Sequence, residues 1–181
     1  VNERYQGSDI EIPIGTTYIA PYAFYGAWIE NLTIPNTVTE IGKYAFSSYV
    51  NTNLMLNTVT FEEGSLLENI GDGAFSECDS LEIINISNGV TRIGNLAFAN
   101  CNNLVSVSIP DSVTQIGKNA FSGCTTLEIN ISESVKTTTF EFFCLAYFTA
   151  LIILEEYRGK ENAISTSSSP IRRPIIKAKR W

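Results

Sequence analysis

The chain has 181 residues, 44% of them hydrophobic, so it is long enough to bury a core of its own. The formal net charge is −7, and there is no histidine. Without histidine, Ser-His-Asp and Cys-His catalysis and histidine zinc sites are excluded. Five of the twelve basic residues lie within the last ten positions, so the rest of the chain is more acidic than the total suggests. Such a chain lacks the basic stripe that nucleic-acid binding requires.

The dipeptide Ala-Phe recurs along the chain at spacings of 22, 29, 23 and 23 residues. The five pairs are Ala23-Phe24, Ala45-Phe46, Ala74-Phe75, Ala97-Phe98 and Ala120-Phe121. A period in this range is typical of a solenoid, whose units bury their apolar faces only when neighbours stack on them. We expect the phenylalanines to stack as a continuous spine in the core.

Each unit begins with a short strand. Ile84-x-Ile86 and Val107-x-Ile109 alternate with period two, which indicates a strand with one buried face. Proline follows two of these strands, at Pro35 and Pro110, and ends the pairing because it lacks an N–H donor. A glycine then follows an isoleucine in four units, at Gly42, Gly71, Gly94 and Gly117. Glycine permits a tight or left-handed bend, so these positions are predicted corners.

The longest interval, of 29 residues, requires insertions. We place them near residues 50–55 and 62–65, and expect both to bulge as surface loops. Ile129-x-Ile131 is the last recognisable strand, and Val135 is the last residue that fits the pattern.

The repeat reads L-x-x-[IV]-x-I-P-x-x-V-x-x-I-G-x-x-A-F-x-x-C-x-x-L and resembles the BspA-like leucine-rich repeats of microbial surface proteins over residues 9–137. The resemblance implies an α/β-type repeat solenoid of about five rungs within residues 1–138. Short parallel strands would line the concave face of its arc, and irregular, short helical or extended segments would form the convex side.

Cys78, Cys101 and Cys124 recur every 23 residues, three positions after a phenylalanine. They form either a disulfide or metal ladder or a column of buried free thiols. Equivalent side chains of a stack point the same way, which is poor disulfide geometry, and an odd number leaves one thiol over. We therefore predict structural thiols, with no metal and no cofactor.

Residues between the core positions of the strands face outward and form columns. The candidate binding residues on these columns are Asn31, Thr33, Thr58, Thr60, Glu82, Asn85, Ser106, Ser108, Glu128 and Asn130. Tryptophan, tyrosine and arginine, which dominate binding hot spots, are missing there. The columns form either a weak, multivalent adhesive surface or a solvated face that binds nothing. Aromatic residues gather instead in the first two units, where packing is favoured over an anchor patch: Tyr22, Tyr25, Trp28, Tyr44 and Tyr49.

The end of the chain departs from the repeat. Residues 139–164 are apolar and predicted to cap the solenoid, while 165–181 are Ser-rich, then basic, and predicted to be disordered. The run 142–154 is shorter than the ~20 residues of a membrane span, so it contacts a membrane only if it is surface-associated. An end that does not fold well is the third alternative.

We expect no enzyme, because no phosphate-binding glycine loop or nucleophile elbow is present. The resemblance implies a non-catalytic protein-binding or adhesion module of a cell-surface or secreted protein. Its partners would be extracellular or host-surface proteins, with no nucleic acid. The alternative is a structural stalk with no ligand of its own. The chain begins at Val1 without a signal peptide, and we expect it to be a processed or excerpted segment.

Overall fold

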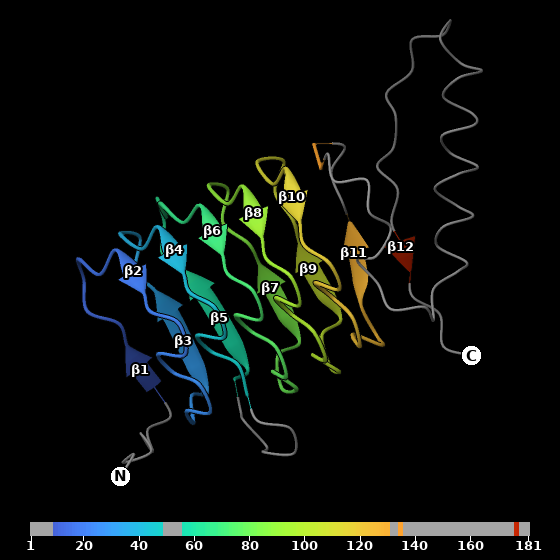
Figure 1. Ribbon diagram of the computed structural model, residues 1–181, viewed down its shortest axis with the longest axis horizontal. Coiled ribbons are helices and arrows are strands. Elements are labelled where there is room, and N and C mark those ends of the chain that lie inside the picture. Colours follow the sequence, from blue (N-terminus) through green and yellow to red (C-terminus); the bar gives the residue numbers. More distant parts are fainter. Residues whose placement is uncertain (1–8, 49–55, 131–133, 136–175, 178–181) are drawn as a thin grey trace, which may run out of the picture.

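The computed structural model describes residues 9–48, 56–130, 134–135 and 176–177. The chain winds through stacked coils, and each coil adds one strand to each of two parallel sheets (Figure 1). Five coils contribute to both sheets, and a sixth begins with one further strand. The sequence therefore predicted the stacked, parallel-sheet architecture correctly.

The first sheet has seven strands in the order β1-β3-β5-β7-β9-β11-β12. Their bounds are β1 Asp9–Glu11, β3 Asn31–Ile34, β5 Thr58–Phe61, β7 Ile83–Asn85, β9 Ser106–Ser108, β11 Glu128–Asn130 and β12 Ile176–Lys177. All neighbours are parallel except β11 and β12, which are antiparallel. The short β12 falls within the predicted disordered tail, whose other residues lie outside the described part, as does the predicted cap at 139–164.

The second sheet has five two-residue strands in the order β10-β8-β6-β4-β2. Their bounds are β2 Tyr18–Ile19, β4 Glu40–Ile41, β6 Asn69–Ile70, β8 Arg92–Ile93 and β10 Gln115–Ile116. The second residue of each strand is an isoleucine that is buried. The first is half-buried or exposed, so this sheet too has one inner and one outer face.

The phenylalanines of the Ala-Phe pairs form a continuous stack through the core. Neighbouring rings lie 5.1–5.4 Å apart between centroids, with interplanar angles of 2–9°. Phe46, Phe75, Phe98 and Phe121 are buried, and Phe24, in the first coil, is half-buried. Parallel rings at this separation are offset-stacked, and each contact adds to the gain from burial.

No helix occurs in the described residues, so the expectation of short helical segments on the convex side is wrong. Around each Ala-Phe pair, successive backbone N–H groups donate hydrogen bonds alternately to the next coil and to their own coil. Phe75 N–H donates to Ala97 O of the next coil (2.8 Å), whereas Ala74 N–H donates to Gly71 O of its own coil (3.2 Å). An α-helix needs every N–H to bond four residues back along the same segment. Here alternate donors are used to join neighbouring coils.

The corner glycines are needed for close approach rather than for a left-handed bend. Gly42, Gly71, Gly94 and Gly117 all lack the positive φ that other glycines of the chain adopt. A Cβ at Gly94 would lie 2.5 Å from the backbone nitrogen of Asp72, in the preceding coil. Coil-to-coil contact therefore excludes a side chain at this position. Ala20 occupies it in the first coil, which stacks on no earlier coil in the described part of the chain.

The three cysteine thiols are free and buried, as predicted, and they also act as hydrogen-bond donors. Each thiol donates to the phenylalanine carbonyl of the preceding coil. The bonds run from Cys78 Sγ to Phe46 O (3.4 Å), from Cys101 Sγ to Phe75 O (3.1 Å) and from Cys124 Sγ to Phe98 O (3.1 Å). A cysteine thus satisfies a buried acceptor that an aliphatic side chain would leave unpaired.

Polar side chains also join the third and fourth coils laterally. Asp72 Oδ1 accepts from Asn95 N–H (2.8 Å), and Asn95 Oδ1 accepts in turn from Lys118 N–H of the fifth coil (2.8 Å). Asp79 Oδ1 likewise accepts from Asn102 Nδ2 (2.8 Å). Side chains at two positions of the repeat, one after the corner glycine and one after the cysteine, therefore accept from backbone or amide donors one coil further on.

The turn after the first-sheet strand varies between coils. In the third coil it carries two extra residues within 62–65, and its Glu62 accepts from Asn36 N–H of the preceding coil (3.0 Å). The other predicted insertion lies outside the described residues. In the fourth coil Ser87 stands where Pro35 and Pro110 stand in other coils, and its Oγ is buried without a hydrogen-bond partner in the described structure.

Candidate functional site

The outer side of the first sheet carries two continuous columns of side chains, here called the strand face. Parallel register places equivalent residues of successive coils side by side. One column contains Asn31, Thr58, Ile83, Ser106 and Glu128, and the other contains Thr33, Thr60, Asn85 and Ser108. The core residues between them, such as Leu32, Val59 and Ile84, point inward and are buried.

The predicted binding residues lie together on or beside the strand face. Nine of the ten are exposed: Asn31, Thr33, Thr58, Thr60, Glu82, Asn85, Ser106, Ser108 and Glu128. The tenth, Asn130, continues the second column opposite Ser108, but its side chain is not described. Thr58 Oγ1 donates to Asn31 Oδ1 (2.7 Å), so these neighbouring side chains are held to each other.

The strand face is acidic, with a small apolar centre. Glu11, Glu82 and Glu128 are exposed on it or at its border, and among the described residues only Lys177 of β12, opposite Glu128, is a basic residue in register with the columns. Ile83 is 53% exposed, and Val105, which precedes the neighbouring strand, is 41% exposed. An exposed apolar pair within a polar surface is a potential contact point for a partner.

The aromatic residues of the first two coils are more exposed than the packing interpretation predicts. Tyr22 is 52% exposed and Trp28 is 49% exposed. Tyr22 stacks on Tyr44 at 5.4 Å between centroids and meets Tyr25 edge-on at 5.6 Å. Packing accounts for Tyr44, because its half-buried ring lies directly against Gly73, and a side chain at position 73 would collide with that ring. It does not account for the others, and Tyr49 lies outside the described residues.

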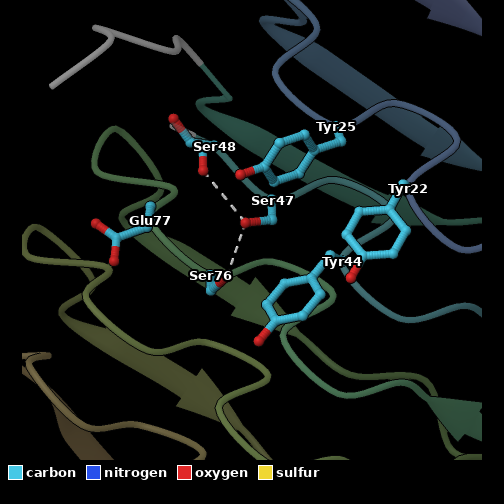
Figure 2. A pocket seen from close by; sticks show the side chains of 7 residues that line it. All are labelled: Tyr22, Tyr25, Tyr44, Ser47, Ser48, Ser76 and Glu77. Atoms are coloured by element: carbon cyan, nitrogen blue, oxygen red, sulfur yellow. Dashed lines mark hydrogen bonds between the residues drawn. The ribbon is translucent and has the colours of Figure 1, made fainter. Parts of the chain in front are cut away.

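These tyrosines border a shallow depression of about 440 Å³ on the turn side of the coils, away from the strand face. Its lining comprises Tyr22, Tyr25, Tyr44, Ser47, Ser48, Ser76 and Glu77 (Figure 2). Ser47 lies at the centre of the group, with Glu77 on the side away from Tyr22 and Tyr44. Ser47 Oγ bonds Ser76 Oγ at 2.8 Å and donates to Ser48 O at 3.3 Å.

Two of the buried thiols are held in their protonated form. Burial raises the pKa of the Cys101 thiol well above its usual range. The hydrogen bond with Cys101, followed by burial, raises the pKa of the Cys124 thiol in the same direction. A thiol held protonated is a poor nucleophile. No group of three or more His, Cys, Asp or Glu side chains suited to a metal ion occurs in the described part of the chain.

The described residues also contain no helix with the length and apolar character of a membrane span. The run 142–154, the predicted point of membrane contact, lies outside them.

Sequence reasoning located the strand face but missed the depression. The tyrosines were visible in the sequence, whereas Ser47, Ser76 and Glu77 were not singled out. A signal was available, because these three residues stand one or two positions after a repeat phenylalanine. Aligning the coils on Phe24, Phe46 and Phe75 would have placed them beside the tyrosines.

Comparison with known proteins supports the fold assignment. The family model of the BspA-type leucine-rich repeat region matches six copies over residues 4–128 and 68–162. No match was found among curated proteins. A solved T. pallidum leucine-rich repeat protein is 31% identical, with a TM-score of 0.59 over 69% of this chain and 56% of its own.

Two further solved structures are similar. A leucine-rich cell surface protein from Faecalibacterium prausnitzii is 33% identical, with a TM-score of 0.59 over 71% of this chain and 33% of its own. A leucine-rich repeat protein from Eubacterium ventriosum is 29% identical, with a TM-score of 0.62 over 74% of this chain and 34% of its own. The chain thus spans between a third and about half of these relatives. With its repeats matched along most of its length, the chain belongs to the BspA-type leucine-rich repeat family.

Proposed function

We propose that the chain is a non-catalytic protein-binding or adhesion module of a cell-surface or secreted protein, and that its strand face contacts the partner. The observation that carries this proposal is the pair of continuous columns of exposed, mostly polar side chains on the first sheet. The family is one of repeat proteins, and such proteins generally act by presenting an extended surface. The surface location is supported by the cell surface protein among its relatives.

The charge of the strand face favours a partner with basic or hydroxyl-rich groups. Glu11, Glu82 and Glu128 are spread along the face, and short Thr, Ser and Asn side chains fill the space between them. A column that repeats the same groups from coil to coil gains affinity by engaging several of them at once. Ile83 and Val105 provide the apolar contact at its centre. Extracellular or host-surface proteins are the partners we expect.

The test is a binding assay of the full chain against immobilised extracellular-matrix and host-surface proteins. Thr60→Lys, Asn85→Lys and Ser108→Lys together add three charges to the strand face. We expect this triple variant to lose binding, because long cationic side chains block the face and cancel its negative charge. The control carries the same added charge at exposed positions off the face: Asn88→Lys, Asn103→Lys and Gln115→Lys.

Circular dichroism establishes that both variants are folded before binding is compared. Equal binding by the two would contradict the strand face as the contact surface. No binding by the folded wild-type chain to any of these proteins would instead support a structural stalk.

A further inference from the structure

The depression beside the tyrosines exists because three positions of the repeat change character between the first and third coils. The position before each Ala-Phe pair carries Tyr22, then Tyr44, then Gly73. The position after the pair carries Tyr25, Ser47 and Ser76. The next carries Gly26, Ser48 and Glu77. At the first two positions large rings thus give way to small residues by the third coil, whereas the third position grows from Gly26 to Glu77, so the rings and the carboxylate stand on opposite sides of a lower surface.

The exposed rings are not required by the fold. Asn119 occupies the position of Tyr22 in the fifth coil, with the same left-handed backbone (φ 55° against 59°). Serine occupies the position of Tyr25 in the second, third and fifth coils, at Ser47, Ser76 and Ser122. The repeat therefore accommodates smaller residues at both positions. Half-exposed rings that the core does not need are a mark of a binding surface.

The lining combines three kinds of group within one small volume. The tyrosine rings supply flat apolar faces, and each also carries a phenol group. Ser47 and Ser76 are buried, and their hydroxyls bond to each other and to backbone carbonyls, so they form a closed polar floor, while Glu77 supplies a carboxylate acceptor on the opposite side. One Glu77 oxygen, Oε1, already accepts from Asn100 Nδ2 at 2.5 Å, which holds the side chain in place. The volume of about 440 Å³ falls in the ~300–1,000 Å³ range of small-molecule sites.

A cationic ligand fits this lining less well than a neutral one. The Lys43 ammonium already lies 5.3 Å from the centroid of the Tyr44 ring, so a positive charge is present beside the aromatic group. Lys43 repels a second cation, and together with the Glu77 carboxylate it leaves the surroundings of the depression without net charge, which suits a neutral ligand. A pyranose ring matches the lining better, because its C–H face stacks on tyrosine while its hydroxyls at the ring edge meet the tyrosine phenols and the Glu77 carboxylate.

We propose that this depression is a binding site for a short neutral saccharide, separate from the strand face and independent of the function proposed for it. Tyr22 and Tyr25 provide the stacking surface. Glu77 accepts hydrogen bonds from the sugar hydroxyls, and the Ser47–Ser76 pair forms the polar floor.

The experiment is saturation-transfer difference NMR of the full chain with four neutral disaccharides: lactose, maltose, cellobiose and diacetylchitobiose. A titration of any saccharide that shows transfer then gives its Kd. Two variants use residues that the same positions hold in other coils, Tyr22→Asn and Tyr25→Ser, so both preserve the fold. The matched control is Tyr18→Gln, which removes an exposed tyrosine outside the depression and introduces the residue of the equivalent position at Gln115.

We expect millimolar or tighter binding of at least one disaccharide, weakened about tenfold or more by each depression variant and unchanged in the control. Transfer from none of the four sugars at millimolar concentration overturns the proposal. So does binding that both depression variants retain at wild-type affinity. Binding of a lysine- or arginine-rich peptide at the depression in place of the sugars would show that it takes cations, which also overturns it.

Discussion

Replacing Phe98 by alanine tests the aromatic stack at its centre. The Phe98 ring is fully buried, and it stacks on Phe75 at 5.4 Å and on Phe121 at 5.3 Å. A buried phenylalanine removes about 150–250 Å² from water, which corresponds to about 4–6 kcal/mol at ~25 cal/mol per Å². Phe→Ala substitutions in protein cores cost about 3–5 kcal/mol. We expect a loss in this range.

Phe24 provides the matched control within the same stack. Its ring is half-buried and has one described stacking neighbour, Phe46 at 5.1 Å. Phe24→Ala should therefore cost about half as much as Phe98→Ala, by the same area argument. Urea unfolding followed by circular dichroism measures both losses, and an unchanged slope with denaturant shows that the two unfolding reactions are comparable. A loss below about 1 kcal/mol for Phe98→Ala, or an equal loss for Phe24→Ala, would refute the reasoning.

Three further predictions concern the contacts between coils. Gly94→Ala should lower the free energy of unfolding by about 1–3 kcal/mol or more, because the new Cβ would meet backbone of the preceding coil. The control Ala20→Gly, at the equivalent position of the first coil, should cost no more than about 1 kcal/mol. Similar urea midpoints for the two variants would contradict this explanation. Ser87→Pro should raise stability by about 0.5–1 kcal/mol in the same assay, and a loss would show that the turn rejects proline. In the folded chain the pKa values of the Cys101 and Cys124 thiols are raised above the unfolded value of about 8.5, so the free energy of unfolding should be constant below about pH 8 and fall as the pH rises past about 8.5. Unfolding midpoints between about pH 7 and 10 measure this fall. A fall of equal size in a Cys101→Ala, Cys124→Ala double variant would exclude these thiols as its cause.

The parts of the fold that repeat in the sequence were predictable from it. The recurring Ala-Phe pair and the period-two strands indicated one buried phenylalanine and one strand per coil, and both occur. The 23-residue recurrence of Cys78, Cys101 and Cys124 likewise indicated a shared core position. These features were accessible because burial in a solenoid imposes the same residue type at the same place in every unit.

The direction of the backbone donors was not predictable, because it is set by the neighbouring coil and not by the local sequence. The segment around Ala97-Phe98 has composition compatible with a helical turn, yet Phe98 N–H donates to Ala120 O of the next coil (2.8 Å). The need for glycine at position 94 was not predictable for the same reason, because a side chain there would collide only with the preceding coil, at residues such as Asp72. The distance between stacked coils determines both the partners of the backbone donors and the need for glycine, and the sequence of one coil does not specify that distance.

The strand face and the tyrosine depression differ in whether their residues follow the pattern of the repeat, and this difference decides which residues to test first. On the strand face Thr60 and Ser108 are small polar residues that many solvated sheets would carry, so their presence alone does not separate binding from solubility. Tyr25 instead stands where three other coils have serine, and Tyr22 stands where the other coils have Tyr44, Gly73, Leu96 and Asn119, so the fold requires a ring at neither position. A repeat provides its own reference for each position, and large exposed side chains that depart from it have no structural reason to be there. The tyrosine depression is therefore the sharper test of ligand binding, although the strand face offers the larger surface.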